Sequence, residues 1–374
     1  MAKFIILFHG RYPSEKAAAT YVTQNAESLV QLGHAVTILS PARRTLNKGN
    51  LNLAPEGCRI IYMPIIDLFE LPILRSAAFW VSLTCFTLSS WLYLKFKSSG
   101  KDNIISNDLL VGLMVNTVSS RLIYEVHDFP ERWHFLYRQL FKRAMLVIAT
   151  NSWKEEMLTA SFSEVHGKVL MERNGVNLEK FYPGDKTVDR TVLGLSTTAP
   201  VVVYTGHLYG WKGVATLMGA AKSLPNIDFY LVGGTKEDIE KYKAEYSSSN
   251  MHFVGHVPHA DVRRWQSSAD MLVLPNTGKD KLSSLYTSPM KLFEYMANKR
   301  PIIASDIPSI REVVGDNMAT LFEPDNSLEL ASAIRQVIEN PKEANKMADI
   351  AYESVLKHSW RSRAMRMCAR VNAL

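Results

Sequence analysis

The sequence is poor in cysteine and lacks several short motifs that mark common classes of enzyme. Its three cysteines, Cys58, Cys85 and Cys368, lie far apart and form no Cys-x-x-Cys pair. This spacing fits reduced thiols in a cytoplasmic protein and offers neither a disulfide framework nor a zinc site of that kind. No His-Glu-x-x-His stretch occurs, and no Gly-x-Gly-x-x-Gly follows a predicted strand as a nicotinamide site would require.

Three further features that the sequence lacks concern metal chelation, nucleic-acid binding and export. There is no Asp-x-Asp, so the sequence does not indicate a carboxylate pair that would chelate a metal ion together with a diphosphate. Basic residues do not cluster with aromatic ones, which argues against a nucleic-acid partner. The first residues, MAKFIILFHG, contain one lysine and a short apolar run without a cleavage site, so we interpret them as a strand rather than a signal peptide.

The totals are those of a globular protein with two domains. The chain has 374 residues, of which 47% are hydrophobic and 21% charged, and this length exceeds what one ordinary core needs. The formal net charge of +7 suits an anionic partner, such as nucleotide phosphates or a membrane surface, without choosing between them.

Short apolar stretches alternate with helical ones along the chain, which predicts an α/β fold with parallel, doubly wound sheets. A helix is predicted over 15–32, ended by Gly33, and the last helices over about 327–372. A polar stretch at 174–200 marks a boundary, after which the pattern restarts. The predicted strands are 3–8, 34–40, 58–64, 103–107, 121–127 and 145–150 before it, and 201–206, 227–234, 251–257, 271–275 and 301–305 after it.

Residues 76–94 form a stretch without charge that is nearly long enough to span a bilayer. We reject a membrane span, because six of its residues are Ser or Thr and it lies between two strands of one predicted sheet. Two interpretations remain open. It is either a crossover helix packed on the sheet or a partly exposed helix that enters the membrane interface, helped by Lys95, Lys97 and Lys101.

A second helix, predicted over 131–143, carries four basic residues. We interpret them as a solvated face first and as a contact to anionic lipid second. Trp133, Tyr137 and Phe141 follow one another at helical spacing, so we expect them in the core.

Lys212 and Gly213 stand where a strand has ended and a helix begins, which would place an ammonium and a helix N-terminus in one anion site. The plainer alternative is a solvated lysine beside a turn glycine. Gly233, in the Val-Gly-Gly turn after another strand, would let a ligand approach the backbone closely or would simply end that strand.

The stretch TSPMKLFEYMANKRP contains the other candidates. Ser288 would cap a helix whose first position is Pro289, and the amides of Met290 and Lys291 would face the same site as Lys212. Glu294 lies about one turn further on, where an ionised carboxylate accepts two hydroxyl hydrogen bonds of a ribose diol. The alternative is an exposed helical glutamate.

Together these stretches resemble family 4 of the retaining glycosyltransferases, and most closely the bacterial branch that builds surface polysaccharides. The resemblance is specific in the second half, where it is carried by YTGHLYGWKG, LVGG, FVGHVPHADV, ADMLVLPN, YTSPMKLFEYMANKRPIIASDIPSIREVV and NGVNLEKFYP. In the first half it is carried more loosely by HGRYPSEKAAATYV and YEVHDFP.

The resemblance implies a GT-B fold, in which two Rossmann-like domains face each other across a cleft. Residues 1–180 would bind the acceptor, 181–355 the nucleotide-sugar donor, and 356–374 would form a helix that crosses back to the first domain. The resemblance also implies that no metal is needed, which agrees with the missing Asp-x-Asp. The donor is a substrate, so no cofactor is expected. The acceptor would be a lipid-linked saccharide at the inner face of the cytoplasmic membrane. The product would serve the synthesis of lipopolysaccharide O-antigen, capsule or exopolysaccharide.

The resemblance also assigns roles residue by residue. Lys212 matches the lysine that binds the donor diphosphate, and Glu294 matches the second glutamate of an E-x7-E motif, which holds the ribose. His127 matches the family's histidine near the donor sugar, although a core histidine at a strand end has the same pattern. Gly10 matches the glycine loop under the diphosphate.

The sequence departs from the family at two positions. Tyr286 occupies the place of the first glutamate of E-x7-E, and Asp280 is a candidate to reach in instead. His207 replaces the usual arginine, and histidine is a weaker cation at neutral pH. Two rival functions remain open: a nucleotide-sugar epimerase of the same architecture, and a non-catalytic partner that binds sugar nucleotides.

Overall fold

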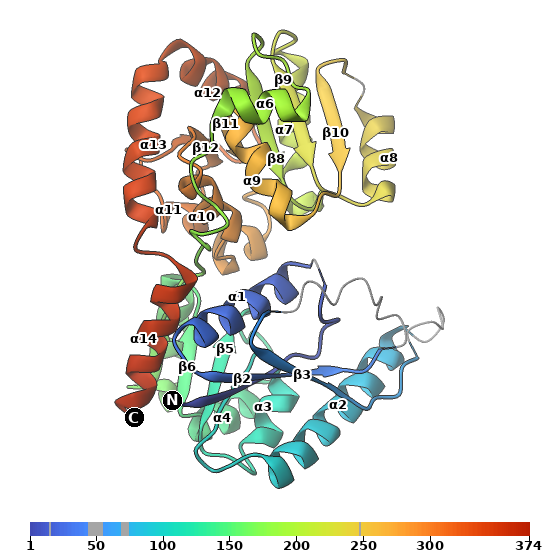
Figure 1. Ribbon diagram of the computed structural model, residues 1–374, viewed down its shortest axis with the longest axis vertical. Helices are drawn as coiled ribbons and strands as arrows, with labels where there is room; N and C mark the ends of the chain where they lie inside the picture. The colour runs from blue at the N-terminus through green and yellow to red at the C-terminus, as the bar shows by residue number, and fades with distance from the viewer. Residues whose placement is uncertain (15, 44–54, 69–74, 247) are drawn as a thin grey trace. The chain divides into compact units, whose positions relative to one another are not determined.

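The computed structural model describes residues 1–14, 16–43, 55–68, 75–246 and 248–374 (Figure 1). The chain divides into two compact units, which are described one at a time. Unit 1 comprises Met1–Arg173 and Trp360–Leu374, and unit 2 comprises Asn174–Ser359. The sequence predicts boundaries after residues 180 and 355, whereas the structure divides the chain after Arg173 and Ser359.

Unit 1 is built on a seven-stranded sheet with the order β3-β2-β1-β4-β5-β6-β7. Every pairing in it is parallel. The strands are β1 (Lys3–Leu7), β2 (Ala35–Pro41), β3 (Cys58–Met63), β4 (Asn103–Ser106), β5 (Leu122–Val126), β6 (Leu146–Ala149) and β7 (Val169–Met171). The helices are α1 (Ala17–Gln31), α2 (Arg75–Lys97), α3 (Leu109–Val115), α4 (His134–Arg143), α5 (Ser152–Ser161), the short η3 (Ser163–Val165) and α14 (Trp360–Asn372).

Unit 2 is built on a six-stranded parallel sheet with the order β10-β9-β8-β11-β12-β13. The strands are β8 (Val201–Thr205), β9 (Asp228–Val232), β10 (Met251–Gly255), β11 (Met271–Leu274), β12 (Ile302–Ser305) and β13 (Thr320–Phe322). The helices are α6 (Lys186–Leu193), η4 (Gly210–Lys212), α7 (Val214–Lys222), α8 (Lys236–Glu245), α9 (His259–Ser268), η5 (Leu282–Tyr286), α10 (Met290–Ala297), α11 (Pro308–Arg311), α12 (Ser327–Glu339) and α13 (Pro341–Val355).

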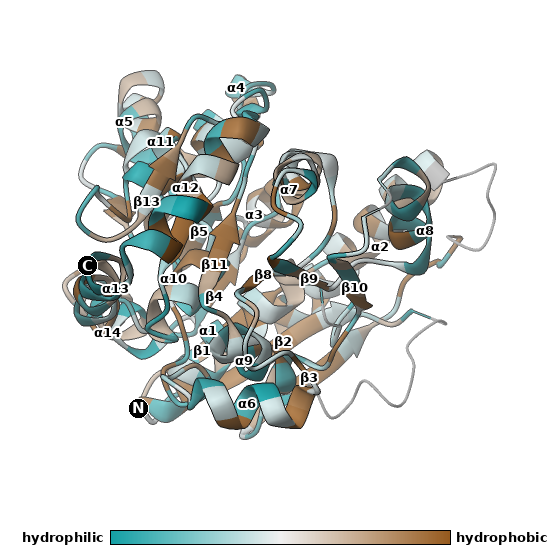
Figure 2. Cartoon of the chain, turned by 90° about the horizontal axis from the view of Figure 1, so that it is seen from above, coloured by the Kyte–Doolittle hydropathy of each residue, from teal (hydrophilic) through white to brown (hydrophobic). Residues whose placement is uncertain are grey.

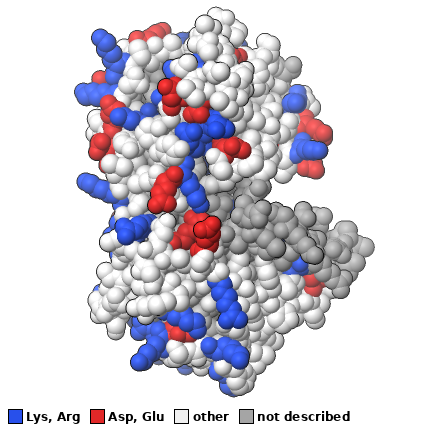
Figure 3. Space-filling view, viewed as in Figure 1, with Lys and Arg blue, Asp and Glu red and all other residues white. Residues whose placement is uncertain are grey.

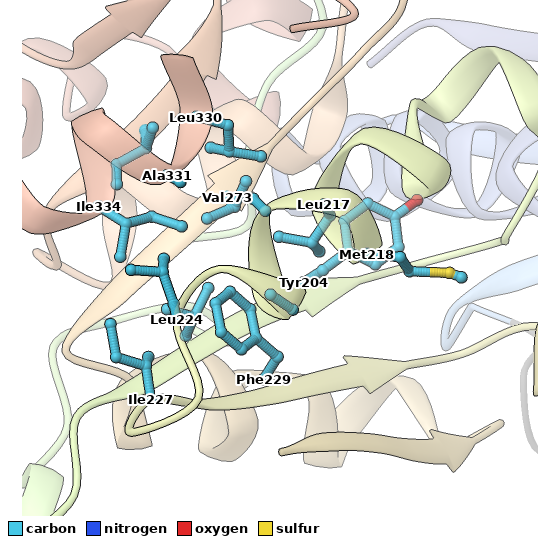
Figure 4. Close-up of a cluster of buried hydrophobic side chains, with 14 of the residues drawn as sticks. Tyr204, Leu217, Met218, Leu224, Ile227, Phe229, Val273, Leu330, Ala331 and Ile334 are labelled. Carbon is cyan, nitrogen blue, oxygen red and sulfur yellow. The ribbon is translucent and has the colours of Figure 1, made fainter. Parts of the chain in front are cut away.

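The central strands of both units are buried on both faces, which is why they are near-continuous apolar runs in the sequence. β8 (VVVYT) is buried at every position, and its side chains alternate between two cores. Val202 and Tyr204 face the cluster under α7 and α12 (Figure 4), whereas Val201 and Val203 face the cluster under α9, α10 and α13. Figure 2 shows the hydrophobic colour concentrated on the strands.

The predicted α/β fold with two parallel sheets is confirmed, and each predicted strand is present. Two strands escape prediction: β7 and β13 have three residues each and lie at the edge of a sheet. The boundary stretch also contains α6, which the sequence analysis misses. α6 begins at an Asp185 side chain that accepts from two backbone amides and ends at Gly194 with φ +67°, so its start and stop signals were present. The predicted first helix begins at residue 15, which lies outside the described residues.

Two helices of unit 1 can be compared with the predictions for them. α2 packs its Leu83, Phe86 and Leu94 into the core below the sheet, so it is a crossover helix, yet another of its faces is exposed. In α4 the expectation of a fully buried aromatic face is wrong. Phe141 is buried, but Trp133 is 67% exposed, because the helix begins only at His134 and Trp133 precedes it with φ +62°.

Candidate functional site

The candidate residues of unit 2 gather where the order of its strands reverses. β8 and β11 are neighbours in the sheet although β9 and β10 lie between them in the chain. Loops that follow two such strands leave in opposite directions and open a crevice at the carboxyl edge, where ligands of α/β proteins bind. Lys212 stands in the loop after β8, and α10, which carries Lys291 and Glu294, follows the loop after β11.

The two loops are fixed against each other at Gly213. This glycine has φ +69°, and a Cβ built on it would lie 1.6 Å from the carbonyl oxygen of Pro275. No larger residue fits there without moving the backbone. The Thr277 amide also donates to the Trp211 carbonyl oxygen at 3.2 Å. The position of Lys212, between Trp211 and Gly213, is therefore set by backbone contacts with the segment after β11.

Lys212 is a partly buried cation without an acidic partner. Among the described residues its ammonium has no hydrogen-bond or ion-pair partner, and its Nζ lies 3.6 Å from the centroid of the Trp211 ring. Burial, together with the neighbouring ammonium of Lys291, holds the pKa of Lys212 well below its usual range. An anion bound here would offset both causes of the lowered pKa. Its negative charge would compensate for the lost hydration of the ammonium and for the repulsion between the two lysines.

Lys291 reaches across from α10 to the end of β8. Its Nζ donates to the Tyr204 hydroxyl at 3.0 Å and lies 4.3 Å from that ring centroid. A Cβ at Gly206 would lie 2.1 Å from the same Nζ, so the glycine leaves room for the ammonium. Burial lowers the pKa of Lys291 to about 7, against the opposing effect of Glu294.

The first turn of α10 differs from prediction at its cap. Ser288 does not cap the helix: its Oγ accepts from the Asn174 amide at 3.0 Å, and no side chain caps α10. Pro289 is the N-cap residue rather than the first helical position. Met290 and Lys291 are therefore the first two residues of the helix, and their amides have no partner within it.

Glu294 lies on the same helix and is 15% exposed. Its Oε2 accepts from Gln266 Nε2 at 3.4 Å, and its Oε1 lies 3.7 Å from His259 Nε2. Both partners come from α9, and neither was singled out in the sequence analysis. A carboxylate held in this way offers its remaining lone pairs to hydroxyl donors.

The other predicted donor-binding residues surround this group. Gly233 has φ +118°, and a Cβ there would lie 2.4 Å from the Gly206 carbonyl oxygen, so the ends of β8 and β9 also touch. The His207 ring stacks on Tyr209 at 5.0 Å. Tyr286 ends η5. Asp280 uses its Oδ1 to accept from the Leu282 amide at the start of η5.

Two predicted residues, Gly10 and His127, belong to unit 1. His127 follows β5 and Gly10 follows β1. His127 is 30% exposed, and its Nε2 is 3.6 Å from Glu125 Oε2. That nitrogen has no hydrogen-bond partner among the described residues. His127 lines a small pocket at the carboxyl edge of the sheet together with Phe8, Asn25, Asn107 and Glu125.

A buried ion pair between Arg363 and Glu125 lies beside His127. Arg363, on α14, donates to Glu125 Oε1 at 2.9 Å, to the Tyr21 hydroxyl at 2.8 Å and to Asn25 Oδ1 at 2.6 Å. Burial alone would raise the pKa of Glu125, but Arg363 and the hydrogen bonds that it accepts lower it to about 2. The C-terminal helix is thus anchored in unit 1 by a charged network beside the candidate histidine.

Metal-binding groups are absent from the described part of the chain: no three His, Cys, Asp or Glu side chains there are grouped as an ion would need. By length and composition, one described helix, Ser76–Lys97, would be able to cross a membrane. It is the α2 crossover helix, partly buried in unit 1.

Comparison with known sequences identifies relatives. Residues 199–340 match the profile of the family described as "Glycosyl transferases group 1". TuaC of Bacillus subtilis, named as a teichuronic acid biosynthesis glycosyltransferase, is 28% identical over 48% of this chain and 44% of its own, so the match spans less than half of that relative. A D-inositol 3-phosphate glycosyltransferase of Corynebacterium urealyticum is 22% identical over 93% of this chain and 88% of its own.

A third relative is named for a lipid product. The alpha-galactosylglucosyldiacylglycerol synthase of Streptococcus pneumoniae is 29% identical over 46% of each chain.

Solved structures share the fold over the whole chain. Sucrose-phosphate synthase from Thermosynechococcus elongatus has a TM-score of 0.81 and 20% identity, covering 100% of this chain and 99% of its own. HepE of Anabaena, in complex with UDP-glucose, has a TM-score of 0.77 and 17% identity over 100% of both chains. These similarities establish the two-sheet architecture of the glycosyltransferases with the GT-B fold.

Proposed function

We propose that this chain, which has the GT-B fold and matches the group 1 glycosyltransferase profile over residues 199–340, moves a sugar from a nucleotide-sugar donor to a lipid-linked saccharide. The product would enter a cell-surface polysaccharide. The observation that carries this proposal is the pair of partly buried lysines at the switch point of unit 2, Lys212 and Lys291, whose ammonium groups lie close enough to affect each other. HepE, which shares the fold, binds UDP-glucose.

The donor diphosphate would lie against the two lysines and the first amides of α10. Breaking the anomeric bond builds negative charge on the leaving phosphate oxygens. Fixed positive charge at that place stabilises the transition state more than the ground state. His207 adds to this charge when it is protonated. Glu294 would accept the ribose hydroxyls, while Gly206 and Gly233 keep side chains out of the crevice.

The transfer would retain the anomeric configuration and use no metal ion. Because no carboxylate is assigned as a nucleophile in this proposal, departure of the phosphate and attack by the acceptor would share one face of the sugar. The leaving phosphate would take the proton of the acceptor hydroxyl. His127, backed by Glu125, would position the sugar rather than act as the base.

The acceptor and the location follow from unit 1. Trp80, Leu88, Leu92 and Phe96 form an apolar stripe on the exposed face of α2, with Trp80 55% and Phe96 72% exposed. Basic residues stand at the end of α2 and along α4, and the lower part of Figure 3 carries more blue than red. A helix with such a stripe and basic flanks suits the interface of an anionic membrane. The relative from S. pneumoniae is named for a diacylglycerol glycolipid.

The donor site is tested by thermal stabilisation, because a bound nucleotide raises apparent stability by mass action. We would measure the melting temperature with UDP, GDP, ADP, CMP and dTDP for the wild type, Glu294→Ala and the exposed control Glu240→Ala. We expect one nucleotide to stabilise the wild type and the control but not Glu294→Ala. If no nucleotide raises the melting temperature of the wild type, the proposed donor site is wrong and a non-catalytic role becomes the better hypothesis.

Catalysis is tested with the sugar form of the nucleotide that binds. Product formation in excess EDTA would support transfer without a metal, and the anomeric proton coupling of the product reports retention or inversion. Turnover of the donor without an acceptor, giving an epimer, would instead support the epimerase.

The membrane contact is tested by sedimentation with vesicles of phosphatidylcholine and phosphatidylglycerol. Replacing Trp80 and Phe96 by Ser removes the most exposed rings of the stripe. Trp91 is not part of it, because its Nε1 donates to Thr117 Oγ1 at 2.9 Å. We expect the double variant to stay in the supernatant while the control Leu328→Ser, in unit 2, sediments as the wild type does. A folded double variant that still sediments fully would contradict the contact.

A further inference from the structure

Gln266 holds a position in unit 2 that the proposed reaction does not yet use. It lies on α9, its side chain is fully buried, and its amide donates to the Glu294 carboxylate. Burying an amide is costly unless its polar atoms are bonded. The partners of this amide therefore define what it does.

Both ends of the Gln266 amide are bound from different elements. Its Oε1 accepts from Asn298 Nδ2 at 2.6 Å, at the end of α10. Its Nε2 donates to Thr205 Oγ1 at 3.1 Å, at the end of β8, and to Glu294 Oε2 at 3.4 Å. A flipped amide would place an oxygen against a carboxylate and an NH₂ group against another NH₂ group. The observed orientation is thus fixed from both sides.

The partners of Gln266 are themselves fixed. Asn298 Nδ2 also donates to the carbonyl oxygen of Glu294 at 2.9 Å. The amide of Thr205 donates to the Tyr295 hydroxyl at 3.0 Å. α10 is therefore tied to β8 and α9 by a buried polar network on both sides of Glu294, and the carboxylate is the point where this network reaches the crevice.

As a result, the two carboxylate oxygens of Glu294 have different hydrogen-bond partners. Oε2 is held by the buried amide, whereas Oε1 lies 3.7 Å from the half-exposed His259, beyond hydrogen-bond distance. The network anchors Oε2, whereas Oε1 accepts no hydrogen bond from the described residues. A glutamate anchored at one oxygen has already lost side-chain freedom that a free glutamate would lose on binding.

We propose that Gln266 is a positioning residue that sets Glu294 in the geometry in which it accepts the hydroxyls of a ribonucleoside diphosphate. This inference rests on the proposed function, because it takes Glu294 to hold the ribose. It adds that donor recognition depends on a buried residue of α9 that does not touch the donor. Removing the amide would cost affinity for the ribose hydroxyls and leave the diphosphate contacts of Lys212 unchanged.

The test compares ribonucleotides with analogues that lack the hydroxyls. Dissociation constants would be measured for UDP, GDP and ADP and for the 2′,3′-dideoxy form of each, in the wild type, Gln266→Met, Glu294→Ala and the double variant. We expect Gln266→Met to weaken the ribonucleotide that binds best by about tenfold and to leave its dideoxy form unchanged. The double variant should bind no more weakly than Glu294→Ala.

Two controls separate positioning from folding. Trp265→Phe changes a neighbouring buried residue of α9 and should leave the ratio of ribonucleotide to dideoxynucleotide affinity unchanged. Thr205→Val removes one anchor of the Gln266 amide while preserving shape. It should lower the same ratio by a smaller factor, which keeps the test available if Gln266→Met does not fold.

The outcomes also distinguish this inference from the proposed function. Equal weakening of both nucleotide forms by Gln266→Met, or no change in either, would overturn the positioning role while Glu294→Ala still loses the preference for ribose. If the wild type itself does not prefer the ribonucleotide, or Glu294→Ala keeps that preference, Glu294 does not hold the ribose. The positioning role and the proposed ribose site would then fail together.

Discussion

Unit 1 and unit 2 each bury positive charge near the carboxyl edge of a parallel sheet, but they treat it in opposite ways. In unit 1, Arg363 lies 2.9 Å from Glu125 and makes two further hydrogen bonds, and the pKa of that carboxyl falls to about 2. In unit 2, Lys212 and Lys291 lie close enough to lower the pKa of Lys212. Glu294 only partly offsets the burial of Lys291.

The charge of Arg363 is paired within the fold, whereas the charges of Lys212 and Lys291 are placed where a ligand would bind under the proposed function. A buried guanidinium that is paired with a carboxylate is stable as it stands, and its loss would damage the protein. A buried ammonium without a partner costs stability in the free protein and repays it only when an anion binds. Under the proposed function, a basic residue would therefore hold the fold in one unit and bind a ligand in the other.

The largest expected effect on this comparison between the two units is that of Arg363→Met. This change leaves Glu125 buried without its partner, and we expect the free energy of unfolding to fall by about 3–5 kcal/mol. Denaturant unfolding followed by tryptophan fluorescence measures it. Arg361→Met, on the exposed face of the same helix, should change stability by less than about 0.5 kcal/mol. A loss in Arg363→Met no larger than in this control would mean that the network contributes little.

Lys212→Met should give the opposite combination of effects. We expect the rate of sugar transfer to fall by about 10²–10³-fold, as for loss of one preorganised group that stabilises a developing anion. The melting temperature should stay the same or rise, because an unpaired buried cation is removed. Lys222→Met, on the following helix, serves as the control for both readouts. A variant that loses activity only in proportion to a lower melting temperature would place Lys212 with the structural charges.

The pH dependence of donor affinity tests the role of the unit 2 lysines, with a smaller expected effect. Because burial lowers the pKa of Lys291 to about 7, the free protein loses this ammonium as the pH rises above 7. A bound diphosphate requires the charged form, so binding takes up a proton, and affinity should fall by up to about tenfold per pH unit above 7. Titration with UDP-glucose from pH 6 to 9 measures this. Lys291→Met should flatten the profile, and a wild-type affinity independent of pH would argue against Lys291 as a diphosphate contact.

Much of the fold could be predicted, because strands buried on both faces leave long apolar runs such as VVVYT and MLVL. The edge strands β7 and β13 were missed because three residues carry too little pattern. Trp133 was misplaced for a related reason. Helical spacing assumes that the helix has already begun, and this residue stands one position before it.

The site was predictable in part. Lys212, Lys291 and Glu294 stand out beside glycines and at a helix start, and the family resemblance joined them. The sequence offers no sign that Asn174 would take Ser288 away from capping α10. It also gives no reason to choose Gln266, because a buried glutamine on a helix has no local pattern. Such partners arise from the packing of α9 against β8 and α10, which a single sequence does not reveal.

The ends of unit 2 meet. Val176 and Ser359 form a parallel bridge, and the Val176 amide donates to the His358 carbonyl oxygen at 3.0 Å. Unit 2 is therefore an insertion within unit 1, entered and left at one point. Segments with adjoining ends can be exchanged without opening a gap in the host. Recombination could then replace 174–359 as one cassette, which would change the sugar delivered while leaving the α2 stripe of the remaining chain untouched.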